Sequence, residues 1–178
     1  MSKTTTLACA CGQFHVELIG EPFISTECHC SSCRNAAERL AALPPAYPMA
    51  NASGGIPYIL YRKDRVRFPD GTAGLAEFRL RDKTPTRRVL TTCCNTPIFL
   101  EFEDGHWLSL FAGLWPEDQR PALQIRTQTG DVPEGTVLDN TLPAGFGPTA
   151  GFYARLLGEW IAMGFKSPKI KIEEKINA

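Results

Sequence analysis

Three cysteines and a histidine fall within six residues of this chain, in the segment ECHCSSCR that runs from Glu27 to Arg34. Zinc takes four ligands in a tetrahedron and accepts cysteine thiolates readily. Thiolates from Cys28, Cys30 and Cys33 would supply three of those ligands from one loop. The fourth corner would then stay open, which is the arrangement of a catalytic zinc site and not of a closed structural one.

The chemistry of such a site depends on its ligands. Three thiolates give the zinc a net charge of about −1, so it is a weaker Lewis acid than zinc held by histidines. A soft ligand, such as a substrate thiolate, suits it best. Two other arrangements stay open: His29 could turn inward as the fourth ligand, or water or a distant cysteine could complete a structural site. Because His29 lies between two candidate ligands, we expect its side chain to point away from the metal.

The remaining four cysteines form two further groups. Cys9 and Cys11 lie two residues apart, so in extended backbone both thiols leave the same face and can reach one metal. Gly12 permits the tight turn that such a pair needs. Cys93 and Cys94 are the expected partners, because a distant pair of thiolates can close a structural zinc site.

The cysteine count argues for metal binding and against disulfides. There are seven cysteines, and they are clustered, whereas a disulfide framework is even in number and spread along the chain. The N-terminal segment MSKTTTLACACG contains one lysine and no apolar stretch, so we expect no secretory signal. The predicted location is the reducing cytoplasm, where thiols stay free or hold metal.

The composition is that of an ordinary globular protein, with 43% hydrophobic and 21% charged residues among 178. We expect a single domain, residues 1–178. Nineteen basic residues balance nineteen acidic ones, so the net charge does not point to nucleic acid. The basic segment Arg62–Arg67 alternates with apolar residues and is expected on the wet face of a strand; Arg87–Arg88 is a second basic segment. No apolar run is long enough to span a bilayer.

The elements that must position these thiols are predicted to be short strands. Polar and apolar residues alternate in several segments separated by turn-forming residues, which predicts a mostly antiparallel β core over residues 7–114. The predicted strands are Gln13–Leu18, Pro57–Tyr61, Ala76–Arg81, Ile98–Glu103 and Trp107–Phe111.

Residues 115–178 are expected to form a C-terminal extension. Apolar residues recur at helical spacing from Phe152 to Met163, which predicts a helix over about residues 149–164 whose aromatic stripe packs on the core. Gly164 or Pro168 would end this helix. Residues Lys169–Ala178 are expected to be a charged, loosely held tail.

Three motifs together resemble the family of glutathione-dependent formaldehyde-activating enzymes, which also includes centromere protein V. They are Cys9-Ala10-Cys11-Gly12, Cys28-His29-Cys30-Ser31-Ser32-Cys33-Arg34, and the late cysteine group followed by Thr96-Pro97-Ile98. The resemblance covers about residues 7–114. It implies an Mss4-like β-tent of short antiparallel strands with zinc knuckles and two zinc ions.

In that family the CxC pair and the late pair hold a structural zinc, and the CxCxxC loop holds a second zinc near the substrate. Carried over to this chain, the structural positions fall on Cys9, Cys11 and Cys94, and the catalytic loop falls on Cys28, Cys30 and Cys33. The family activity is that of a carbon–sulfur lyase, which forms or breaks the adduct between glutathione and formaldehyde. The implied partner is therefore a small-molecule thiol or the thiol adduct of a small aldehyde.

The chain departs from the family pattern at the late cysteine pair. The family has Cys-x-x-Cys-Gly there, whereas this chain has Thr91-Thr92-Cys93-Cys94-Asn95. Asn95 is benign at the glycine position, since asparagine tolerates a positive φ. Thr91 does not replace a thiolate, so we expect Cys93 to supply the fourth ligand through an unusual backbone turn. A three-ligand or vacant site, and a vicinal disulfide between Cys93 and Cys94, are the alternatives.

Two functions from different classes follow. The first is a zinc-dependent carbon–sulfur lyase, in which Arg34 could attract a substrate carboxylate, although a structural or solvated arginine is the commoner case. The second is a non-catalytic, zinc-stabilised binding module, because fold alone does not decide function. Methionine sulfoxide reductase chemistry would need a reactive cysteine outside the metal sites, and Cys93 alone could be spare. The sequence identifies neither the substrate nor the oligomeric state.

Overall fold

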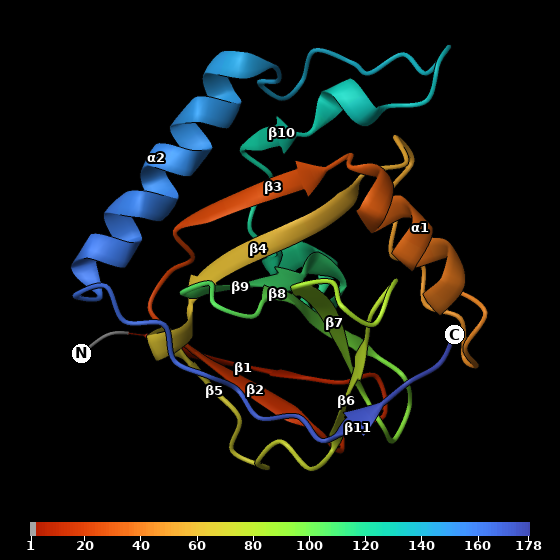
Figure 1. Ribbon diagram of the computed structural model, residues 1–178, viewed down its shortest axis with the longest axis vertical. Coiled ribbons are helices and arrows are strands. Elements are labelled where there is room, and N and C mark those ends of the chain that lie inside the picture. The colour runs from red at the N-terminus through yellow and green to blue at the C-terminus, as the bar shows by residue number, and fades with distance from the viewer. Residues whose placement is uncertain (1–2) are drawn as a thin grey trace.

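The computed structural model describes residues 3–178, in which two β-sheets and two α-helices confirm the mainly β class with a C-terminal helix (Figure 1). The strands are β1 (Thr4–Ala8), β2 (His15–Ile19), β3 (Ile24–Cys28), β4 (Ile56–Arg62), β5 (Val66–Arg67), β6 (Leu75–Phe78), β7 (Thr86–Thr91), β8 (Pro97–Phe102), β9 (Trp107–Phe111), β10 (Ile125–Thr127) and β11 (Glu174–Lys175). The helices are α1 (Ser31–Leu40) and α2 (Phe146–Ala162).

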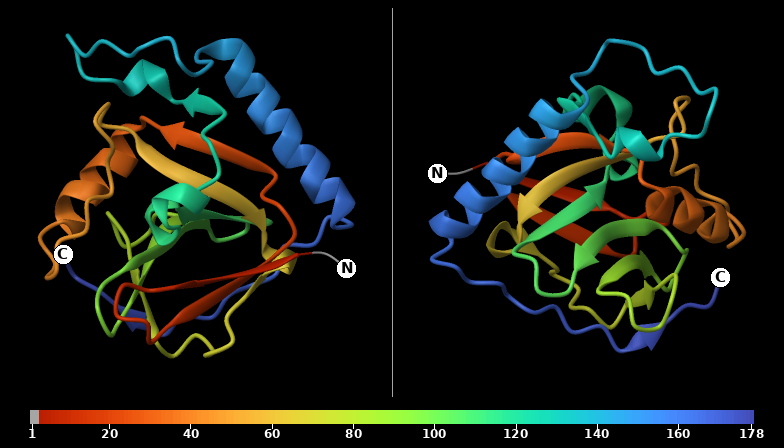
Figure 2. Two further views of the ribbon diagram at one scale, coloured as in Figure 1. Left: turned by 180° about the vertical axis from the view of Figure 1, so that it is seen from behind. Right: turned by 45° about the horizontal axis from the view of Figure 1, so that its top comes forward.

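The two sheets are mostly antiparallel, as predicted. The small sheet has the strand order β1-β2-β5, and the large one has the order β10-β3-β4-β9-β8-β7-β6-β11. Pairing is parallel at the two edges of the large sheet, where β10 joins β3 and β11 joins β6. Helices α1 and α2 lie at opposite ends of strands β3 and β4 (Figures 1 and 2).

All five predicted strands are present, with ends shifted by a few residues. Strand β6 is the most shortened, since it ends at Phe78 and not at Arg81. Strands β3 and β7 were not predicted from the sequence. Every residue of β3 except Cys28 is buried, and so is every residue of β7 except Thr86. A strand that is covered on both faces has no polar–apolar alternation by which the sequence could show it.

The large sheet uses its two faces differently. One face packs against the small sheet, where Val16 and Leu18 of β2 meet Ile59 and Leu110 of the large sheet. The side chains of β2 and of Phe14 just before it alternate as predicted, and Phe14, Val16 and Leu18 are at most 3% exposed. The opposite face carries a row of neighbouring cross-strand residues, which are Leu60, Ser109, Leu100, Arg88 and Phe78. Helices α1 and α2 pack on this second face.

The C-terminal residues 169–178 are not the loose tail that the sequence predicts. Strand β11 pairs with β6, and the Ile176 amide donates to the Glu77 carbonyl at 2.9 Å. Ile170 and Ile172 pack against the core, and Arg39 donates to the main-chain oxygen of Ala178. Isoleucines placed between the lysines and glutamates explain the difference, because they bury apolar surface that a charge count overlooks.

The large sheet also extends beyond the predicted core of residues 7–114. Strand β10, at residues 125–127, forms one edge of it, and the buried Arg126 belongs to this strand. The predicted helix is present as α2, and Gly164 follows its end with a φ of 62°. None of the helices in residues 3–178 combines the length and the hydropathy needed to cross a bilayer.

The aromatic stripe of α2 packs on the core only in part, which corrects the prediction. Leu156 and Met163 are buried, whereas Tyr153 is 55% exposed. The C-terminal half of the helix is held by Trp160, whose ring stacks on His106 with centroids 5.9 Å apart, and by an ion pair between Glu159 and Arg62. The N-terminal half lines a cavity that is described below.

The basic segments are not a continuous wet face. Lys63 is 5% exposed and its ammonium contacts the carboxylate of Glu101. Arg87 is also buried and binds Glu101 at 2.6 Å and Glu77 at 2.9 Å. The prediction of a solvated strand face is therefore wrong for Lys63, because a buried carboxylate on β8 pairs with it.

This buried network predicts a large effect of Glu101→Gln on stability. The substitution keeps the shape but removes the charge that compensates Lys63 and Arg87. Breaking a buried ion pair from one side typically costs about 3–5 kcal/mol, and we expect a loss of that size in urea unfolding. Glu103→Gln is the matched control, since the Glu103 side chain is 51% exposed and pairs with Arg79; its loss should stay below about 1 kcal/mol. Equal losses for the two variants would contradict a special role for the buried pair.

Candidate metal centres and the cavity beside them

Four cysteines from two distant turns come together in one group. Cys9 and Cys11 lie in the turn between β1 and β2, and Cys93 and Cys94 lie in the turn between β7 and β8. Their four sulfurs all lie within 4.8 Å of one another. The Sγ–Sγ distance is 3.4 Å between Cys9 and Cys11 and 3.3 Å between Cys11 and Cys93. The group therefore joins the small sheet to the large one and could hold a metal ion.

The backbone around this group explains how the adjacent cysteines reach one point. Gly12 has a φ of 75°, and Asn95 has a φ of 55°, so asparagine does take the left-handed conformation predicted for the family's glycine position. The sulfurs of Cys93 and Cys94 are 3.7 Å apart, so they form no disulfide. The vicinal-disulfide alternative is therefore wrong, and Cys93 belongs to the same group as Cys9, Cys11 and Cys94.

The thiols of this group differ in their pKa values. Burial opposes ionisation of Cys94, but hydrogen bonds with the hydroxyls of Thr91 and Thr96 lower its pKa to about 5. Burial and contact with Cys11 raise the pKa of Cys93 to about 12. Four crowded sulfurs can all be thiolates only beside a cation, and that requirement fits a metal ion such as zinc.

The second group consists of Cys28, Cys30 and Cys33, whose sulfurs also lie within 4.8 Å of one another. No fourth cysteine, histidine or carboxylate of residues 3–178 belongs to this group. Cys28 ends β3, and Cys30 and Cys33 lie at the start of α1. Among the described residues, the group therefore consists of three sulfurs without a fourth protein donor.

Helix α1 is the element that the sequence analysis missed at this site. Cys30 is its N-cap residue, and the Cys30 sulfur accepts a hydrogen bond from the Cys33 amide at 3.3 Å. Cys33, Ala36, Ala37 and Leu40 are buried at the spacing of one helical face, which is the signal that could have revealed it. A helix N-terminus favours negative charge, so α1 stabilises thiolates at its first turn.

The three thiols cannot ionise together without a cation. Hydrogen bonds with Cys28 and Cys30 lower the pKa of Cys33 to about 3. Contact with Cys30 and Cys33, together with burial, raises the pKa of Cys28 well above its usual value. Ionisation of Cys33 therefore makes ionisation of the other two thiols less favourable, and a bound metal ion would allow all three to be thiolates.

His29 is not part of the cysteine group, in agreement with the sequence analysis. Successive residues of extended backbone point to opposite faces, so Glu27 and His29 leave β3 on the side away from the thiols. The His29 ring is 1% exposed, and its Nε2 lies 2.7 Å from Glu27 Oε1. Burial raises the pKa of Glu27, but the Ser53 hydroxyl and the charge of Arg126 outweigh it and hold the pKa below its ordinary value.

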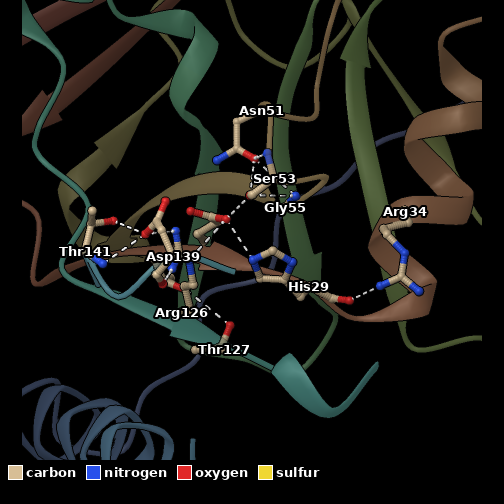
Figure 3. Close-up of polar contacts among 11 residues, drawn as sticks. His29, Arg34, Asn51, Ser53, Gly55, Arg126, Thr127, Asp139 and Thr141 are labelled. Carbon is tan, nitrogen blue, oxygen red and sulfur yellow. Dashed lines mark hydrogen bonds and ion pairs between the residues drawn. The ribbon is translucent and has the colours of Figure 1, made fainter. Parts of the chain in front are cut away.

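A polar network joins the residues around His29 and Arg126 (Figure 3). Arg126 of β10 lies 3.5 Å from Glu27 and pairs with Asp139 at 3.0 Å, so it ties the loop after β10 to β3. Gly55 lies against the pair of Glu27 and His29. A Cβ at position 55 would come within 2.5 Å of Glu27 Cγ and 2.8 Å of His29 Nε2, which explains why glycine is needed there.

The three-cysteine group lies in the wall of a cavity of about 430 Å³. Cys28, Cys30 and Cys33 line it together with Gln128 and several hydroxyl-bearing residues, which are Thr26, Ser32, Tyr58, Thr86, Ser109, Thr127, Thr149 and Tyr153. The Tyr58 hydroxyl donates to the Cys33 sulfur at 3.6 Å. A volume of this size falls within the ~300–1,000 Å³ of small-molecule sites. The group is therefore reachable by a ligand.

Arg88 is the one charged side chain among the described residues that line this cavity. It is 1% exposed, and its Nη2 donates to the carbonyl of Ser32 at 3.1 Å and to the hydroxyl of Ser32 at 2.9 Å. Its Nε is buried and has no hydrogen-bond partner in residues 3–178. The positive charge also favours the thiolate of Cys33. No local sequence pattern points to Arg88 at this site, because only strand pairing places it beside the cysteines.

Arg34 has a structural contact, since its Nη1 donates to the carbonyl of His29. It does not line the cavity, so the structure gives no support to binding of a substrate carboxylate by Arg34. Arg88, which belongs to β7, lines the cavity instead.

Comparison with known proteins places the chain in a family. The family model described as "Glutathione-dependent formaldehyde-activating enzyme" matches residues 4–129. This range contains both cysteine groups and Arg88 but ends before α2. The paired sheets are consistent with the Mss4-like β fold that the resemblance implied. No curated protein matches the chain.

Proposed function

The chain belongs to the family of glutathione-dependent formaldehyde-activating enzymes, and we propose that it is a zinc-dependent carbon–sulfur lyase acting on the thiol adduct of an aldehyde. The observation that carries this proposal is the position of Cys28, Cys30 and Cys33 in the wall of a cavity, with no fourth protein ligand in their group among the described residues. A closed structural site would have no such opening.

We assign the three-cysteine group to a catalytic zinc and the four-cysteine group to a structural zinc. The donor chemistry of both cysteine groups fits zinc, because their crowded thiols can all become thiolates only beside a cation. A zinc ion at Cys28, Cys30 and Cys33 would supply a binding position for a soft sulfur ligand. Cys9, Cys11, Cys93 and Cys94 would hold the second ion and link the two sheets.

The residues of the cavity have separate roles in this proposal. When a thiol adds to an aldehyde, negative charge develops on the former carbonyl oxygen, and when the adduct breaks the same charge precedes loss of the thiol. The Arg88 guanidinium could donate to that oxygen, since Arg88 lines the cavity and its Nε has no hydrogen-bond partner among residues 3–178. Preorganised donors of this kind stabilise a transition state without reorganising during the reaction. Tyr58 orients the Cys33 sulfur by its hydrogen bond.

We test the proposal with purified protein, glutathione and formaldehyde. Adduct formation is followed beside the uncatalysed reaction, and zinc is counted per chain with and without added thiol. We expect a rate above background and two zinc ions per chain. A rate equal to background would exclude this substrate pair, and one zinc per chain would argue against an open second site.

Arg88→Met should lower kcat by about 10²–10³-fold, which is the usual effect of losing one preorganised donor to a developing oxyanion. The methionine fills a similar volume, so the zinc content should stay unchanged. Arg88→Lys keeps the charge and should recover part of the rate. Wild-type kcat in Arg88→Met with a normal zinc count would remove Arg88 from the mechanism.

We also propose that the protein works in the cytoplasm. All seven cysteines are free thiols in the structure, which supports a reducing environment.

A further inference from the structure

The cavity beside Cys28, Cys30 and Cys33 is larger and less polar than an adduct of formaldehyde requires. Its volume of about 430 Å³ falls within the ~300–1,000 Å³ range of small-molecule sites. Formaldehyde contributes one carbon and one oxygen to its adduct. Most of the space must therefore be filled by another part of the substrate.

Apolar side chains from four elements form a large part of the cavity wall. These are Leu60 of β4, Leu100 and Phe102 of β8, Trp107 of β9, and Phe152 and Leu156 of α2. Tyr153, which is 55% exposed, adds a second aromatic ring from α2. Apolar walls with a few polar groups are typical of sites that bind hydrophobic parts of ligands.

The charges of the cavity do not match glutathione well. Glutathione carries two carboxylates and an ammonium group, and each needs a partner if it leaves water. Arg88 is the one charged residue of the described part of the chain that lines the cavity, and no carboxylate lines it. The charges of the wall therefore differ from those that glutathione needs: it has one guanidinium for two carboxylates, and the negative charge nearest to an ammonium group would be that of the cysteine thiolates.

The wall on α2 lies outside the part of the chain that matches the family. The match ends at residue 129, whereas α2 spans Phe146–Ala162. Helix α2 is nevertheless fixed in place, because Leu156 is buried in the core and Glu159 and Trp160 bind Arg62 and His106. Phe152 and Tyr153 are thereby held over a cavity whose sulfurs belong to the shared region.

From these observations we propose that the substrate is a hydrophobic thiol adduct, in which an alkyl or aryl group next to the carbon–sulfur bond lies against Phe152 and Tyr153. The inference rests on the proposed lyase function and names its substrate class. The reaction is R–SH + R′CHO ⇌ R–S–CH(OH)–R′, in which the sulfur lone pair forms the C–S bond. The carbonyl π pair moves to oxygen, which takes the proton released by the thiol, so no oxidant or reductant is needed.

The first arm of the test varies the aldehyde with 2-mercaptoethanol, a small uncharged thiol, as the fixed partner. Acetaldehyde, butanal and hexanal are compared, and each kcat/KM is divided by the uncatalysed rate constant. We expect the ratio to rise about twofold to fourfold for each added methylene, as burial of a methylene predicts. Phe152→Ala should abolish the increase of this ratio with chain length. Tyr153→Ala should reduce the increase, and because Tyr153 is exposed, the variant should still fold.

The second arm measures binding without turnover. Titration calorimetry compares benzyl mercaptan with 2-mercaptoethanol, which share a thiol and differ in the apolar group. We expect benzyl mercaptan to bind at least tenfold more tightly to the wild type, with the preference reduced to below threefold in Phe152→Ala. Leu157→Ala is the matched control, because Leu157 is 52% exposed on the same helix and does not line the cavity.

The outcomes separate the inference from the function on which it rests. A rise in the first arm assigns the apolar group to the aldehyde, and tight binding in the second assigns it to the thiol; either result supports the proposal if the α2 variants remove it. Flat responses in both arms, or preferences that Phe152→Ala and Tyr153→Ala leave intact, overturn it. If no aldehyde turns over, the lyase function fails, and the calorimetric arm alone decides the inference.

Discussion

Cys30→Ser is expected to remove catalysis while leaving the protein folded. Serine is among the best N-cap residues, so it can accept the hydrogen bond from the Cys33 amide that the Cys30 sulfur accepts now. It does not replace a thiolate as a zinc ligand. Loss of an outer partner of a metal site already costs about 10–100-fold, so loss of a direct ligand should lower kcat/KM by more than about 100-fold.

The measurement combines kcat/KM, zinc per chain and thermal unfolding. We expect zinc to fall from two ions to one and the unfolding temperature to shift by a few degrees at most. Activity near the wild-type level would show that the three-cysteine group is not the reaction site. An unfolding temperature that drops as far as in Cys9→Ser would instead make the second zinc mainly structural, which is the expectation for a binding module.

Cys9→Ser is expected to unfold the protein. Cys9 is 4% exposed, and its group connects the turn between β1 and β2 to the turn between β7 and β8. Structural zinc contributes apparent binding energies of about 10–16 kcal/mol in small zinc domains. Total stabilities of folded domains are about 5–15 kcal/mol. We therefore expect the free energy of unfolding to fall by more than about 5 kcal/mol.

Urea titration followed by far-UV circular dichroism measures this loss, and a zinc chelator added to the wild type should reproduce it. Thr92→Ser is the control in the same turn, since Thr92 is exposed and outside the cysteine group; its stability should match that of the wild type. A Cys9→Ser protein that unfolds cooperatively within about 1 kcal/mol of the wild type would show that the fold does not depend on this site.

Local patterns in the sequence were enough to identify several features. The alternation of Phe14, Val16 and Leu18 predicted β2, and the spacing from Phe152 to Met163 predicted α2, because amphipathic periodicity reflects the face that each element buries. The position of His29 between two cysteines predicted its direction away from them. Each of these depends on residues that are close together in the chain.

Strands without alternation escaped prediction for the opposite reason. Strands β3 and β7 are covered on both faces, so burial left no period in their sequences. The isoleucines of residues 169–178 were hidden among charges, although they dock on the core. In both cases, the residues that pair with the segment or bury it are distant in the sequence.

By itself, the sequence determined which residues could bind metal, because the thiols of one segment are brought together by a few backbone angles. Only the tertiary structure decided which distant thiols meet: Cys11 and Cys93 are 82 residues apart and in contact. It also decided that Arg88 lies beside the cysteine loop and that α2 closes the cavity with aromatic rings. The reason is physical, since strand pairing and helix packing across the whole domain set these contacts and no short segment encodes them alone.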